Sequence, residues 1–95
     1  MRIKAIKIEP AIVIKIFEKH DIQQDEVVEL LKEDYPTFRK VGGDQYLAMG
    51  LAKSRYVTIY FRYDTQTEEA EITTAYPSDG GQIKSYKRWK HDRQT

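Results

Sequence analysis

The side chains of this sequence that could do chemistry are mostly basic or aromatic. Arginine and lysine bind phosphate groups, and the rings of tyrosine and tryptophan stack on nucleic-acid bases. The candidates for such contacts are Arg55, Tyr56, Tyr60, Arg62, Tyr76, Lys84, Tyr86, Lys87, Arg88 and Trp89. Seven tyrosines in 95 residues could equally cap a thin core with their amphipathic rings. The set therefore indicates either an RNA-binding surface or the packing of a small domain.

Cleavage of RNA without a metal ion places three demands on the side chains of a site. One group takes the proton from the 2′-hydroxyl, positive charge stabilises the crowded phosphate, and an acid protonates the leaving oxygen. The protons could be transferred by His20, Tyr76, Tyr86 or a lysine. We expect Arg62 and Arg88 to supply the charge from one basic cleft, with Tyr76 at a strand end beside them.

Arg62 and His20 each also have a simpler explanation. Arg62 could form a surface ion pair with Glu69 or Glu71 on the next strand, a contact that is worth little. His20 ends a predicted helix, where a histidine often only favours the helix dipole.

The sequence lacks the motifs of several enzyme classes. It contains no Gly-rich phosphate loop, no Ser-His-Asp spacing and no His-x-x-x-His pattern. It has no cysteine, and His20 and His91 lie too far apart in the sequence to indicate a local metal pair. We therefore expect neither a metal site nor a cofactor.

Length and composition predict a single globular domain over residues 1–95. The chain is 40% hydrophobic and 33% charged, which is typical of a folded domain with one modest core. No apolar run approaches the roughly 20 residues that a membrane span needs, and the first residues alternate instead of forming a signal-peptide core. We expect a cytoplasmic protein that does not enter a membrane.

Positive charge gathers at the end of the chain, although the net charge is only +1. Residues 82–95 contain five Lys or Arg and one Asp, whereas residues 1–81 contain eleven Lys or Arg and fourteen acidic residues. A basic tail on a slightly acidic body fits a polyanion or an acidic partner bound at the tail. Such a tail is also typical of a solvated face.

The strand that organises the fold is predicted at residues 56–63, which alternate and are rich in β-branched and aromatic side chains. One face carries Val57, Ile59 and Phe61, and the other carries tyrosines, Thr58 and Arg62. We expect the apolar trio to pack against two helices. Their contributing residues are predicted to be Ile16, Phe17, Val27 and Leu31.

The remaining elements follow from the same periodicities. A short strand is predicted at 2–8, helices at 10–20 and 24–33, and strands at 38–41, 46–52 and 69–76. A turn is predicted at 53–55, and a last helix begins after Ser78 or Asp79 as its cap. The order predicts an α+β fold, in which a small antiparallel sheet of three or four strands has helices packed on one face. The other face of the sheet is then open.

Short segments of the sequence resemble those of a known family. They are Lys19-His20-Asp21-Ile22, Glu26-Val27-Val28, Tyr46-Leu47-Ala48-Met49-Gly50, Ile72-Thr73-Thr74-Ala75, and Tyr86 amid Lys and Arg. In this order, over roughly residues 14–89, the chain resembles the BrnT-type toxins of the RelE/ParE superfamily. Two positions depart from the family pattern, because Tyr76 stands where the family has arginine and Asp21 where it has glycine.

The resemblance implies a RelE/ParE-like fold, metal-independent cleavage of messenger RNA, and an antitoxin that neutralises the protein. Tyr76 in place of arginine also leaves room for a module of the same fold that binds RNA or protein without cleaving it. A third interpretation is a ParE-like inhibitor of a topoisomerase.

Overall fold

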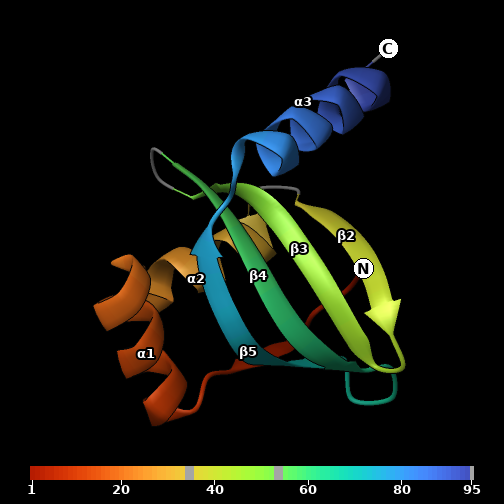
Figure 1. Ribbon diagram of the computed structural model, residues 1–95. Helices are drawn as coiled ribbons and strands as arrows, with labels where there is room; N and C mark the ends of the chain where they lie inside the picture. Colours follow the sequence, from red (N-terminus) through yellow and green to blue (C-terminus); the bar gives the residue numbers. More distant parts are fainter. Residues whose placement is uncertain (34–35, 53–54, 95) are drawn as a thin grey trace.

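The computed structural model describes residues 1–33, 36–52 and 55–94, in which three helices and five strands form an α+β fold (Figure 1). The elements in chain order are β1 (Ala5–Lys7), α1 (Pro10–His20), α2 (Gln24–Glu33), β2 (Thr37–Gly42), β3 (Gln45–Ala52), β4 (Arg55–Asp64), β5 (Glu69–Pro77) and α3 (Gly80–Gln94). The strands form one sheet in the order β1-β5-β4-β3-β2.

The sheet is larger than predicted and it is mixed. Strands β2 to β5 form the predicted antiparallel meander, but β1 adds a fifth strand that runs parallel to β5. The prediction of a purely antiparallel sheet of three or four strands was therefore wrong. A three-residue strand carries little periodicity, and its partner lies more than sixty residues away in the chain. The part of the predicted turn at 53–54 lies outside the described residues.

Helices α1 and α2 have the predicted bounds because their ends are marked by local chemistry. Pro10 stands in the first turn of α1, where its missing N–H costs nothing. Asp21 ends the helix in a left-handed conformation with φ 54°, and its amide donates to the carbonyl of Phe17 at 2.9 Å. This turn leaves His20 at the end of α1 and directs Ile22 into the core.

The core lies between the sheet and the two N-terminal helices. Val57, Ile59 and Phe61 are fully buried there, as predicted, and so are the predicted helical residues Ile16 and Val27. Leu31 is 5% exposed. The prediction for Phe17 was wrong, because its side chain is 50% exposed. Consecutive helical residues point about 100° apart, so a helix that buries Ile16 turns its neighbour away from the sheet.

Helix α3 projects from one end of the sheet (Figure 1). Its first turn is fixed by a capping box, in which Asp79 Oδ1 accepts from the amide of Gln82 at 2.8 Å and Gln82 Oε1 accepts from the amide of Asp79 at 3.0 Å. One turn later Tyr86 is 2% exposed, with its ring 5.6 Å from that of Tyr56 on β4. The start of α3 is thereby anchored against the face of the sheet opposite the core.

Among the described residues, no helix is long and apolar enough to cross a membrane.

Candidate nucleic-acid interface

An aromatic cluster lies on the sheet face opposite the core, toward the end of the sheet where β5 leads into α3. The rings of Tyr60 and Tyr76 are stacked with centroids 6.0 Å apart, and their hydroxyl oxygens are 3.5 Å apart. The ring of His20 is tilted toward Tyr76 at a centroid distance of 6.2 Å. We refer to His20, Tyr60 and Tyr76 as the His-Tyr cluster.

The fold brings these three residues together from distant parts of the chain. Tyr60 and Tyr76 share a face because Tyr60 pairs with Thr74 and Tyr76 pairs with Thr58 in the antiparallel register. β1 pairs only with residues 69–71 of β5, so the later part of β5 is an edge. The end of α1 lies at this edge and places His20 beside Tyr76.

A hydrogen-bond network holds the cluster against the start of α3. Gln82 donates through Nε2 to the Tyr76 hydroxyl at 3.3 Å, and its Oε1 accepts from Thr58 Oγ1 at 3.2 Å. Thr58 is fully buried, and its hydroxyl also lies 2.7 Å from that of Ser78. The network connects Tyr76, β4 and the first turn of α3, so it restricts the orientation of the Tyr76 ring.

The surroundings of Tyr60, whose hydroxyl accepts a hydrogen bond from that of Tyr76, favour its neutral form over the phenolate. The hydrogen bond with Tyr76 and, to a lesser degree, burial raise the pKa of Tyr60 above its ordinary value, while the nearby charge of Arg39 opposes the rise. The Tyr60 hydroxyl therefore remains protonated at neutral pH. Within the part of the chain that the structure describes, no hydrogen bond engages the ring of His20.

A groove of about 540 Å³ separates α3 from the open face of β2 and β3. It is lined by Thr37, Phe38, Arg39, Leu47, Met49, Asp79, Gly81, Gln82, Ser85, Tyr86 and Trp89. A mostly apolar groove of this size with a few polar groups suits a small planar ligand such as a nucleobase. Arg39 pairs with Leu47, which pairs with Tyr60, so the groove and the His-Tyr cluster belong to one surface.

Arg39 and Gln82 are functional candidates that the sequence analysis missed. The sequence does carry a signal for Gln82, because it stands three residues after Asp79, which is the spacing of a capping box. Arg39 follows the half-buried Phe38 on a short strand, and only the pairing of that strand reveals which face it shares with the tyrosines.

Arg62 lies at the other end of β4, away from α3. It stands opposite Gln45 and Glu71, whereas Val57, five residues earlier, stands opposite Pro77 near the start of α3. Five strand residues span about 17 Å. Since α3 extends away from the sheet (Figure 1), the structure does not bring Arg62 and Arg88 into the one cleft that the sequence predicted.

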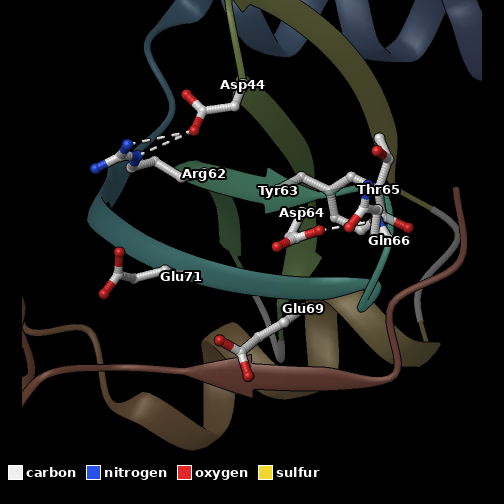
Figure 2. A pocket seen from close by; sticks show the side chains of 8 residues that line it. All are labelled: Asp44, Arg62, Tyr63, Asp64, Thr65, Gln66, Glu69 and Glu71. Atoms are coloured by element: carbon white, nitrogen blue, oxygen red, sulfur yellow. Dashed lines mark hydrogen bonds and ion pairs between the residues drawn. The ribbon is translucent and has the colours of Figure 1, made fainter.

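The surroundings of Arg62 are acidic. Figure 2 shows its guanidinium pointing to Asp44, with an Nη2 to Oδ2 distance of 3.3 Å, instead of pairing with the predicted Glu69 or Glu71. Asp64, Glu69 and Glu71 line the same hollow of about 550 Å³. Four carboxylates around one guanidinium repel a polyanion, so this end of the face is a poor place for RNA.

Arg55 serves the packing of the helices. Its guanidinium pairs with the Glu26 carboxylate, with Nη2 3.3 Å from Oε2, and the Glu26 side chain is only 7% exposed. Arg55 also donates to the backbone carbonyls of His20 and Asp21 at the end of α1. It thereby stabilises the turn that positions His20, and it does not face the groove.

Replacing Arg55 with alanine is expected to lower the free energy of unfolding by about 1–3 kcal/mol, because the buried Glu26 carboxylate loses its partner. Urea denaturation measures the change. Arg62→Ala is the matched control on the same strand, where loss of an exposed ion pair costs about 0–1 kcal/mol. Equal effects of the two substitutions would contradict the structural role of Arg55.

The predicted contact residues of α3 fall into two groups. Tyr86 is buried, and Trp89 is half-buried with its ring stacked on that of Tyr86 at 6.0 Å. The predicted basic residues Lys84, Lys87 and Arg88 are all exposed. The helix therefore packs through its aromatic side chains and presents basic side chains to solvent.

Among the described residues, no group of three or more His, Asp or Glu side chains is arranged to hold a metal ion.

Comparison with known proteins gives a structural likeness but no match by sequence. No protein-family model and no curated protein matches the sequence. The 1.1 Å crystal structure of the ribonuclease toxin BrnT from Brucella abortus is similar, with a TM-score of 0.64 and 12% identity over 79% of this chain and 96% of that chain. At this identity the likeness is one of fold. The chain therefore has a BrnT-like fold, which resembles that of a ribonuclease toxin.

Proposed function

We propose that this protein is the toxin of a toxin–antitoxin pair in the RelE/ParE superfamily, and that it cleaves messenger RNA without a metal ion. One observation carries the proposal: a histidine ring lies beside a stacked tyrosine pair on the open face of a fold that resembles a ribonuclease toxin. An imidazole and hydroxyl groups are sufficient to move the protons of this reaction.

RNA binding is assigned to the face that joins the His-Tyr cluster and the groove. Single-stranded bases stack on aromatic rings, and Tyr60 and Tyr76 offer two half-buried rings on one surface. Arg39 supplies positive charge on the same face. Its planar guanidinium suits two oxygens of a phosphate.

In the proposed reaction, His20 takes the proton from a ribose 2′-hydroxyl, and the 2′-oxygen attacks the adjacent phosphorus. The bond between phosphorus and the 5′-oxygen breaks, and Tyr60 gives its proton to that leaving oxygen. Tyr76 and Arg39 stabilise the negative charge on the crowded phosphate. The products are a 2′,3′-cyclic phosphate and a free 5′-hydroxyl, and His20 later returns its proton to the tyrosine through solvent.

Replacing Tyr76 with alanine is expected to weaken the binding of single-stranded RNA by a factor of about 5–150, because one base–aromatic stack is worth about 1–3 kcal/mol. Tyr76→Phe keeps the ring and should retain most of the affinity. Fluorescence anisotropy with a labelled oligoribonucleotide measures both variants. Arg62→Ala is the control, and its affinity should stay within about twofold of the wild type because Arg62 lies in the acidic hollow.

The proposal includes an antitoxin whose acidic segment covers the basic side chains of α3. Lys84, Lys87 and Arg88 are positioned for such charge complementarity.

A second candidate function is a module that binds RNA without cleaving it. The separation of Arg62 from Arg88 favours it, since the site has fewer guanidinium groups to stabilise a phosphate than the sequence predicted. Tight binding of RNA that stays intact at a stoichiometric excess of protein would select this alternative.

A further inference from the structure

A second hollow, of about 210 Å³, also borders Tyr86. It is lined by Leu51, Tyr56, Tyr86, Lys87, Lys90 and His91. Among the described residues, Tyr86 is the one that lines both hollows, and its side chain is buried. We refer to the second one as the lysine hollow.

The lysine hollow has an aromatic floor and a basic rim. Lys87, Lys90 and His91 lie three and four residues apart, which places them on one side of α3. Lys87 Nζ lies 5.7 Å from the ring centroid of Tyr56, and Lys90 Nζ lies 5.5 Å from that of Tyr86. Lys90 also donates to the Tyr86 hydroxyl at 3.2 Å. These contacts hold the two ammonium groups at the edge of the hollow.

The chemistry of the hollow fits a phosphate. No carboxylate is among its lining residues in the described part of the chain, in contrast to the hollow around Arg62, which has four. Two ammonium groups and an imidazole can together donate several hydrogen bonds to one phosphate, and Leu51 and Tyr56 offer apolar surface for the attached sugar or base.

The lysine hollow and the His-Tyr cluster also lie along the same strand, β4. Tyr56 and Tyr60 project from the same face of β4, and the four residue steps from one to the other span about 13 Å. A few nucleotides of an extended strand cover this distance. An RNA strand that follows β4 would thus reach the lysine hollow after leaving the cluster.

We infer that the lysine hollow is a subsite for a backbone phosphate of single-stranded RNA, a few nucleotides away from the bond that is cleaved. The inference rests on the proposed function, because it extends the path of the RNA bound at the His-Tyr cluster. In this subsite, Lys87 and Lys90 bind the part of the RNA that lies beyond the cleaved bond. Oligonucleotides long enough to reach both places therefore bind more tightly than short ones.

The test compares two charge-matched double variants of the full chain. Lys87→Gln/Lys90→Gln removes the basic rim, and the amide introduced by Lys90→Gln retains a hydrogen-bond donor for the Tyr86 hydroxyl. Lys84→Gln/Arg88→Gln removes the same charge from positions of α3 that line neither hollow. Thermal denaturation shows that each variant is folded. Fluorescence anisotropy then measures affinity for a dinucleotide, which is too short to reach both places, and for an oligoribonucleotide of about twelve nucleotides, which lies within the range of common site sizes, over a range of salt concentrations.

The rim variant is expected to bind the longer RNA on the order of tenfold more weakly, with the affinity for the shorter RNA unchanged within about twofold. The slope of log affinity against log salt should fall by about 0.7 for the longer RNA, the value for one single-strand phosphate. Equal losses for both lengths, or equal losses in the two double variants, would overturn the subsite. A wild-type protein that binds neither RNA would instead remove the proposed function, and the subsite with it.

Discussion

Replacing His20 with alanine is expected to lower the rate of RNA cleavage by a factor of about 10²–10⁴, which is the usual contribution of a general base or acid. The substitution removes the imidazole that lies beside Tyr76 and leaves the core intact, because the His20 side chain is only partly buried. Rates are measured under single-turnover conditions with a fluorescent RNA. Affinity for RNA should change much less than the rate.

Two controls separate a chemical role of His20 from a structural one. Free imidazole added to His20→Ala should restore part of the rate, since it can occupy the space left by the ring and take the 2′-hydroxyl proton. Lys15→Ala, an exposed substitution on the same helix, should cleave within about twofold of the wild type. A His20→Ala protein with an unchanged rate would show that another group is the base.

Replacing Phe61 with alanine is expected to lower the free energy of unfolding by about 3–5 kcal/mol. Phe61 is fully buried, and its ring lies 5.9 Å from that of Tyr46 and 6.2 Å from that of Phe38. The loss is a large part of the roughly 5–15 kcal/mol that stabilises a typical domain. The midpoint of urea denaturation measures the change. The slope of unfolding free energy against urea concentration, compared between variant and wild type, shows whether their unfolded states are alike.

Phe17→Ala is the matched control for Phe61→Ala, because it removes the same ring from a side chain that is 50% exposed. The expected change is well below that of Phe61→Ala, at about 1 kcal/mol or less. Similar midpoints for the two variants would contradict the arrangement of α1 against the sheet.

The elements were largely predictable because each carries a local signal. Pro10 and the break after His20 mark α1, and alternation from Tyr56 to Tyr63 marks β4. Features that depend on long-range pairing were not predictable. The parallel position of β1 and the exposure of Phe17 are set by how the helices pack on the sheet, which periodicity alone leaves undetermined.

The types of residue in the candidate site could be predicted from the sequence, but their positions in the fold could be predicted only in part. Alternation correctly put Tyr60 and Arg62 on one face, but it could not show that the face is acidic around Arg62. His20 and Tyr76 are 56 residues apart in the chain, and only the packing of α1 at the edge of β5 brings their rings together. Residue types thus indicated RNA, whereas the pairing of strands decides which side chains meet.

The central claim is that the His-Tyr cluster cleaves RNA, and analysis of reaction products tests it most directly. Purified wild-type protein is incubated with a defined RNA in the presence of a metal chelator, alongside the same RNA with 2′-deoxyribose at the cleaved position. We predict cleavage of the first RNA to a 2′,3′-cyclic phosphate and no cleavage of the second, because the 2′-hydroxyl is the attacking group. RNA that stays intact, or cleavage of the deoxy-substituted strand, would contradict the account.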